Sequence, residues 1–261
     1  MTATLGSLSP SFSLTNQAMP AYTVTTLTDD AARPANCNDT SSGAPSYSSC
    51  SLRDAIAAAA LIAQTSISPA TTALMPTINF SNSLGLSAGS PGVYSVKVNG
   101  ALKITANMDI VGPGASLLNI DGGKAAQVFS IKGSNVTASI SGLTIANGYS
   151  DDSRGGGIDL ESGTLTVGNS TFSGNTSSFG GGVDSTSTMT VSNSTFTGNS
   201  ASEGGGIENI GTLTVNNSTF SGNTASMGGG IGNRLATLMV SNSIFSGNTA
   251  AASSSGGDLR E

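Results

Sequence analysis

The chain contains neither histidine nor tryptophan, and only 9% of its 261 residues are charged. Without histidine, the Ser/His/Asp and Cys/His arrangements of nucleophilic catalysis are excluded. The net charge of −6 argues against nucleic acid as a partner, since nucleic acids attract basic patches. No apolar run approaches the length of a membrane span, so the sequence predicts no transmembrane segment.

Basic residues are also missing from the N-terminus, where no Lys or Arg precedes Arg33. A secretory signal peptide opens with a basic region, so residues 1–21 do not fit one and are interpreted as an N-terminal extension.

Cysteine is scarce as well, with only Cys37 and Cys50, in a loop rich in Ser, Asn and Gly. Joined as a disulfide, the pair indicates an exported protein, because disulfides persist in oxidising compartments. Two free thiols are the alternative.

Glycine is abundant, with 35 residues, and much of it belongs to a repeat. NSTFTGNSASEGGGI at residues 193–207 returns as NSTFSGNTASMGGGI at residues 217–231. Two positions recur in four copies at a nearly constant spacing: Phe172, Phe196, Phe220 and Phe245, and Ile158, Val183, Ile207 and Ile231. A fixed period of this length is typical of a solenoid, whose units bury apolar side chains only by stacking.

Within one unit, residues 212–217 alternate polar and apolar, which is the period of a strand, and the Gly and Asn clusters indicate bends. We therefore predict an all-β parallel solenoid of roughly eight coils of about 24 residues over residues 75–261, most regular over 155–250. The four phenylalanines should stack inside it. A side-chain amide ladder at one corner is predicted for Asn169, Asn193, Asn217 and Asn242.

Residues 52–64, LRDAIAAAALIAQ, break this pattern, because they are rich in Ala and favour a helix. Ser51 and Asp54 resemble a capping box at its start. Since solenoid ends expose core and strand edges, we predict that residues 22–74 form an N-terminal cap whose helix covers the open end.

The segment Cys50-Ser-Leu-Arg-Asp-Ala-Ile56 follows an acidic, Thr-rich strand at residues 23–30. It resembles the N-terminal CSLREA module of bacterial surface proteins, with Asp54 in place of the usual Glu. That module typically precedes a right-handed parallel β-helix of the pectin-lyase-like superfamily. The GGGI and FSGN elements are similar to repeats of polymorphic outer-membrane proteins, which are autotransporter adhesins. The resemblance implies a right-handed parallel β-helix with a structural or adhesive role at the bacterial cell surface or outside the cell.

The same superfamily includes polysaccharide lyases and hydrolases, so a polysaccharide-active enzyme is the alternative function. The hydrolases carry Gly-His-Gly and Arg-Ile-Lys elements, and this chain has neither. The lyases use an Arg or Lys base near Ca²⁺-binding carboxylates, and only Arg154 and Arg234 fall within the repeats. The sequence therefore predicts no catalytic residue and favours a protein that is not an enzyme.

Three acidic residues recur at the same position of successive repeats. Asp159, Asp184 and Glu208 each come directly after the stacked aliphatic residue. They should point outward on three successive coils, about 5 Å apart. Like charges this close raise one another's pKa or recruit a cation. We expect a solvated acidic edge that keeps the rod soluble. The functional alternative is a site for Ca²⁺ or a glycan, or a pair of carboxylates at the separation of retaining glycosidases. No other cofactor is expected.

The last coil has no helix, proline-rich stop or cysteine pair after Asn248 to cover it. An open coil presents unpaired backbone groups that template further strand pairing. We therefore expect end-to-end self-association into a filament, with residues 22–27 as the docking strand.

Overall fold

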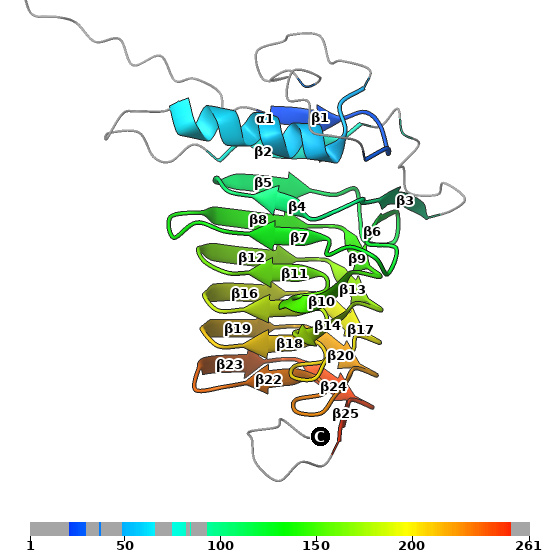
Figure 1. Cartoon of the computed structure of the whole chain (residues 1–261), viewed down its shortest axis with the longest axis vertical. Coiled ribbons are helices and arrows are strands. Elements are labelled where there is room, and N and C mark those ends of the chain that lie inside the picture. The colour runs from blue at the N-terminus through cyan, green and yellow to red at the C-terminus, as the bar shows by residue number, and fades with distance from the viewer. Residues whose placement is uncertain are drawn as a thin grey trace, which may run out of the picture.

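The computed structural model describes residues 21–29, 37, 49–65, 75–81, 84 and 93–251. The described residues form one stack of parallel strands with helix α1 (Leu52–Thr65) across its N-terminal end (Figure 1). The helix agrees with the prediction for residues 52–64. The extension predicted for residues 1–21 lies outside the described residues except for Ala21. Among the described residues, no helix is long and apolar enough to cross a membrane.

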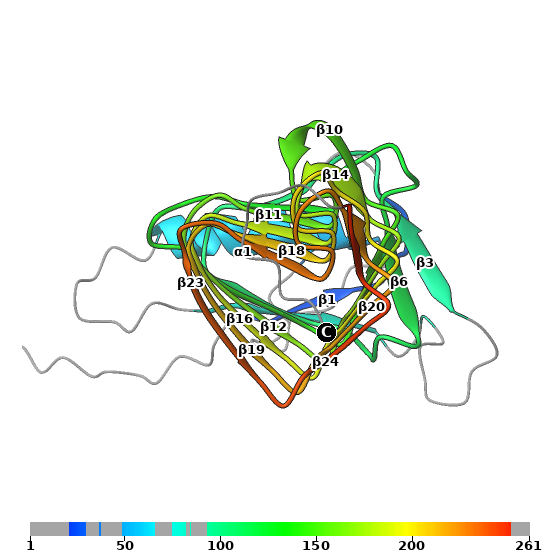
Figure 2. The same cartoon turned by 90° about the horizontal axis from the view of Figure 1, so that it is seen from below.

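Three parallel sheets enclose a roughly triangular core when the stack is seen end-on (Figure 2). Sheet A contains β1 (Ala21–Val24), β2 (Thr77–Phe80), β5 (Met108–Val111), β8 (Thr137–Ser141), β12 (Thr164–Gly168), β16 (Thr188–Ser192), β19 (Thr212–Asn216) and β23 (Thr237–Ser241). Sheet B contains β3 (Tyr94–Lys97), β6 (Leu118–Asp121), β9 (Thr144–Ala146), β13 (Thr171–Ser173), β17 (Thr195–Thr197), β20 (Thr219–Ser221) and β24 (Ile244–Ser246). Sheet C contains β4 (Leu102–Ile104), β7 (Phe129–Ile131), β11 (Ile158–Leu160), β15 (Val183–Ser185), β18 (Ile207–Asn209) and β22 (Ile231–Asn233).

Two smaller pairs of strands lie between sheets B and C in chain order. β10 (Tyr149–Arg154) pairs with β14 (Thr176–Phe179), and β21 (Thr224–Ala225) pairs with β25 (Thr249–Ala250). Figure 2 shows β10 and β14 outside the strands of sheet C.

The described stack contains about six complete coils, as the six strands of sheet C show, and not the eight predicted. The early coils are longer than the repeat. The core residues Ile78, Ile110, Ile140 and Val167 stack on successive strands of sheet A, and each step between them spans more of the chain than one repeat does. The shorter, constant period begins only after them, so dividing the chain length by that period overestimates the number of coils.

The predicted phenylalanine stack is confirmed. The ring centroids of Phe172, Phe196, Phe220 and Phe245 are 4.5, 4.7 and 4.8 Å apart in succession, and the rings are within 5° of parallel. The first three rings are completely buried, and Phe245 in the last coil is partly buried. Strict register between coils therefore produces a continuous aromatic column.

The predicted amide ladder exists, but the residues assigned to it were wrong. Its members are Asn175, Asn199, Asn223 and Asn248: each side-chain Nδ2 donates to the Oδ1 of the next, at 2.8–2.9 Å. The four asparagines predicted from the sequence are exposed and have φ of 49–50°: Asn169, Asn193, Asn217 and Asn242. They occupy a left-handed corner, a conformation that Asn tolerates better than most residues. Both asparagines of each repeat thus mark corners, and only one of them points inward.

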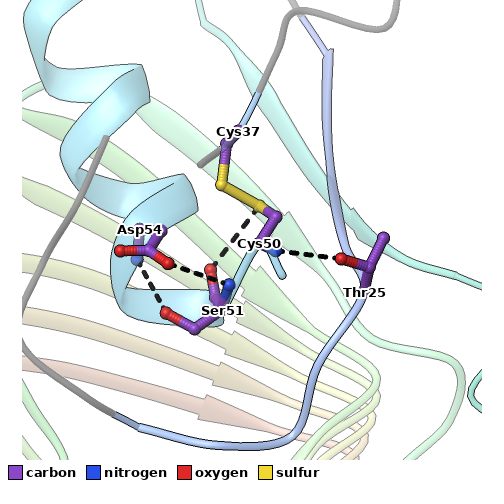
Figure 3. Close-up of a disulfide and its surroundings, with 5 residues drawn as sticks. All are labelled: Thr25, Cys37, Cys50, Ser51 and Asp54. Atoms are coloured by element: carbon purple, nitrogen blue, oxygen red, sulfur yellow. Dashed lines mark hydrogen bonds between the residues drawn. A yellow bond between two sulfur atoms is a disulfide. The ribbon is translucent and has the colours of Figure 1, made fainter. Parts of the chain in front are cut away.

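The cap contains the predicted disulfide between Cys37 and Cys50, with Cα atoms 5.0 Å apart (Figure 3). The Cys50 backbone N–H donates to Thr25 Oγ1 at 2.9 Å, which joins the bridge to the strand segment after β1. The next residues form the capping box: Ser51 N–H donates to Asp54 Oδ2 at 3.2 Å, and Asp54 N–H donates to Ser51 Oγ at 3.1 Å. Asp54 is therefore able to fill the role usually taken by Glu.

Arg53 connects this cap to the first coil. Its guanidinium forms a bidentate ion pair with Asp29 at 2.6 and 2.8 Å, and it donates to the carbonyls of Gly100 and Ala101. On the opposite side of the helix, Leu52, Ala55 and Ala59 are buried against the core. The cap thus covers apolar core and satisfies backbone acceptors at the N-terminal end.

Candidate functional site

The three acidic residues singled out from the sequence do lie on successive coils. Asp159 of β11 is paired in register with Asp184 of β15, and Asp184 with Glu208 of β18. Each follows a buried aliphatic residue, so alternation along the strand turns its side chain to the outer face of sheet C. Strand spacing places neighbouring Cα atoms about 4.8 Å apart. We call these three residues the acidic column.

The acidic column is not the exposed edge that we expected. Asp184 is 0% exposed and Glu208 is 1% exposed, while Asp159 is only partly exposed. Their cover comes from the segments that precede each glycine triplet, which lie outside sheet C (Figure 2). A period-2 pattern predicts which face a side chain takes, but it cannot reveal a second layer of chain over that face.

The triple glycines explain how the chain folds back so tightly. Gly180 and Gly204 have φ of 60° and 63°, and a Cβ atom at either position would collide with the backbone of the acid-bearing strand that follows. Only glycine fits this combination of left-handed backbone and close approach. The triplets therefore press the covering segments against sheet C.

A second column runs along this cover. Arg154, Phe179, Glu203 and Met227 are paired with one another on successive coils, and each stands immediately before a glycine triplet. We call them the covering column. The position before each glycine triplet can be read from the sequence, but a search for charged residues alone does not find Phe179.

Basic groups approach the acids from the covering column and from the residue that follows β22. Arg154 Nη1 lies 3.4 Å from Asp184 Oδ2, and Arg234 Nη1 lies 3.4 Å from Glu203 Oε2. Both guanidinium groups also lie over the ring of Phe179, at 5.7 and 5.8 Å from its centroid, a distance at which cation–π attraction acts. The structure therefore assembles the only two arginines of the repeats around one aromatic ring.

The carboxylates remain incompletely satisfied. Asp159 Oδ1, Asp184 Oδ1 and Glu208 Oε2 are buried and have no hydrogen-bond partner among the described residues. Gly232 continues the acidic column on the next coil, and a Cβ there would collide with Glu208 Oε2. The missing side chain provides the space that the Glu208 carboxylate occupies.

Burial raises the pKa of all three carboxyl groups. Desolvation, reinforced by Asp184 and Glu161, raises the pKa of Asp159 to about 6. Desolvation raises the pKa of Asp184 to about 6 although Arg154 opposes it. The pKa of Glu208 rises to about 7 through desolvation and the nearby Glu203 and Asp184 carboxylates. Near neutral pH, the burial of these carboxyl groups therefore favours a proton or a cation beside their oxygens.

The chemistry open to this site is proton exchange and the binding of positive or hydrogen-bonding groups. Within the described part of the chain, no group of three or more His, Cys, Asp or Glu side chains is arranged to hold a metal ion. Asp159 is partly exposed, whereas Asp184 and Glu208 lie beneath the covering column.

Comparison with known protein families identifies the fold. A family model described as a right-handed beta helix region matches residues 115–259, more than half of the chain. The chain belongs to the right-handed β-helix family. This match confirms the predicted handedness of the solenoid. No curated protein and no solved structure matches the chain.

Proposed function

We propose that this right-handed β-helix protein is an exported structural or adhesive rod of the bacterial cell surface or extracellular space. The observation that carries the proposal is the Cys37–Cys50 disulfide. A disulfide persists outside the reducing cytosol, and this one joins the loop before α1 to the capping box. The resemblance of the cap to the CSLREA module and of the coils to adhesin repeats supports the same role.

The geometry of the acidic column also favours binding or architecture over turnover. A catalytic carboxyl group must come within hydrogen-bond reach of its substrate, and Asp184 and Glu208 are covered. The outer faces of the coils offer a long surface for a glycan or a cell-surface ligand instead.

Surface labelling of the producing bacterium tests the proposal. We expect an impermeant biotin reagent to label the protein on intact cells, and thiol alkylation without reduction to leave Cys37 and Cys50 unmodified. Purified protein should then bind members of a panel of immobilised glycans and host-cell extracts. Recovery in the cytosol with both thiols alkylated would contradict the proposal.

Self-association is the second part of the proposal, and its basis is the last coil. Leu235, Met239, Val240 and Ile244 are large apolar side chains that are all exposed in this one coil. Among the described residues, β22, β23 and β24 are each the last strand of their sheet. Exposed apolar side chains beside strand edges favour docking of another copy. Docking between unlike ends does not close on itself and produces a filament.

A polysaccharide-active lyase or hydrolase is the alternative, and the raised pKa values of the acidic column favour it. A carboxyl group with a pKa near the working pH is a suitable general acid or base, and Asp159 is partly exposed beside Arg154 and Asp184. Release of reducing or unsaturated ends from a panel of polysaccharides, lost in Asp159→Asn, would establish it. Calorimetry with Ca²⁺, repeated on the variant with Asn, Asn and Gln at the three acidic positions, tests the Ca²⁺ prediction.

A further inference from the structure

The outer face of sheet A carries a two-dimensional array of threonine that the proposed role does not use. Register pairing aligns one rank of five threonines across five coils: Thr137, Thr164, Thr188, Thr212 and Thr237. A second rank lies two residues further along each strand and contains Ser139, Thr166, Thr190, Thr214 and Met239. We call these two ranks the threonine array.

The spacing of the array follows from strand geometry. Neighbouring members of a rank are separated by the strand spacing, about 4.8 Å, and the ranks by two residues of a strand, about 6.6 Å. Each threonine of the first rank is exposed, and so are Thr166 and Thr190. In the described part of the chain, the hydroxyl groups of Thr164, Thr188 and Thr190 donate to no protein acceptor. These hydroxyls are therefore available to an external lattice.

The array is also rigid and uncharged. Threonine is branched at Cβ and has few side-chain rotamers, and each strand rests on a buried layer such as Leu165 and Val167. No outward position of β8, β12, β16, β19 or β23 holds a charged residue, although the chain as a whole has a net charge of −6. A face of this kind is complementary to an uncharged partner with a regular lattice of hydrogen-bonding groups.

We propose that the threonine array binds ice. Oxygen atoms on a prism face of hexagonal ice repeat in two directions at intervals close to those of the array. Threonine offers each lattice site a hydroxyl that joins the water network and a methyl group that is surrounded by it. Crystalline polysaccharide is the competing lattice. Proteins commonly bind sugar rings by stacking them on aromatic side chains, and the array contains no aromatic residue.

Sheet B provides an internal comparison. Thr144, Thr171, Thr195 and Thr219 also align there, but the neighbouring rank contains Ala146, Ser173 and Ser221 and only one threonine, Thr197. The Thr197 hydroxyl already accepts a hydrogen bond from Ser221 at 3.2 Å. Sheet B therefore lacks a second rank of free threonines, which makes it a matched control on the same coils.

The test uses the full disulfide-bonded chain and compares Thr190→Tyr in the array with Thr195→Tyr on sheet B. We expect the wild-type protein to inhibit ice recrystallisation and to lower the freezing point below the melting point. Thr190→Tyr should lose most of this activity, and Thr195→Tyr should keep it. A second variant, Thr190→Ser, retains the hydroxyl without the methyl group and should lose part of the activity at an unchanged melting temperature.

Three results would overturn the proposal. The first is a wild-type protein without effect on ice at any concentration reached. The second is an equal loss of activity in the sheet A and sheet B variants. The third is adsorption to microcrystalline cellulose or chitin that depends on Thr190 while ice is unaffected.

Discussion

At the scale of single residues, stability depends on identical side chains that stack on one another in successive coils. Phe196 and Phe220 lie in contact as parallel rings, and Asn199 and Asn223 share a side-chain hydrogen bond of 2.9 Å. Each such residue interacts with the coil below and the coil above. Replacing one residue therefore affects two interfaces at once.

Phe220→Ala removes the third ring of the stack, which is completely buried. We expect the free energy of unfolding to fall by about 3–5 kcal/mol, as for other buried aromatic truncations. Chemical denaturation followed by circular dichroism measures the change. The adjacent outward-facing variant Thr219→Ala is the control and should change stability little. A loss below about 1 kcal/mol for Phe220→Ala would contradict the buried stack.

The acidic column should make stability depend on pH. Its carboxyl groups have folded-state pKa values of about 6, 6 and 7, above the ordinary values of 3.8 and 4.5. The folded chain then holds more protons than the unfolded chain between about pH 4 and pH 7, so the contribution of these groups to stability falls as the pH rises through that window. Above it the loss is complete and stays constant.

Denaturation of the wild type and of the triple variant Asp159→Asn, Asp184→Asn, Glu208→Gln at a series of pH values checks this prediction. The free energy of unfolding of the variant, relative to that of the wild type, should increase as the pH rises from about 4 to about 7. A difference that is independent of pH would show that the three carboxyl groups titrate normally.

At the scale of elements, the cap is a structural unit that packs against the first coil. α1 contacts β1, β2, β4 and β5, and Arg53 adds the ion pair with Asp29. These contacts replace the next coil, which would otherwise cover the N-terminal core.

Reduction of the Cys37–Cys50 bridge should loosen this cap. The bridge spans a sequence separation of 13 residues, and a loop of that size corresponds to about 3 kcal/mol in the chain-entropy account of disulfides. We expect a lower melting temperature in reductant, and the Cys37→Ser, Cys50→Ser variant should melt at the same lower temperature in its absence. A variant that melts like the oxidised wild type would mean that the bridge does not stabilise the fold.

At the scale of the whole molecule, the two ends of the stack differ. The N-terminal end is covered by α1, and the last described coil exposes four large apolar side chains. This asymmetry is the physical basis for proposing assembly between unlike ends.

Ile244→Lys tests that assembly. Ile244 is 63% exposed, so a lysine there should leave the fold intact and weaken association, because an unpaired charge would be buried in the interface and apolar contact would be lost. Light scattering over a concentration series should show wild-type oligomers and a smaller species for the variant. Thr195→Lys, on sheet B away from the end, is the control. A wild type that stays monomeric at high concentration would refute the assembly.

Local sequence pattern alone determined the parallel solenoid, the phenylalanine stack and the extent of α1. A short, constant period leaves only stacking as a means of burying Phe172, Phe196 and Phe220, and an Ala-rich segment is incompatible with that stack. The register of Asp159, Asp184 and Glu208 followed from the same period.

Tertiary structure alone decided which face was solvated and which asparagine pointed inward. Asp184 is buried because another segment of chain folds over its strand. Asn175 is buried and forms the ladder, whereas Asn169 is exposed at a left-handed corner. Arg154 and Arg234 are far apart in the chain, and the stacking of coils brings both of them to the ring of Phe179. Contacts between coils depend on the path of the backbone at each corner, and a one-dimensional pattern does not specify that path.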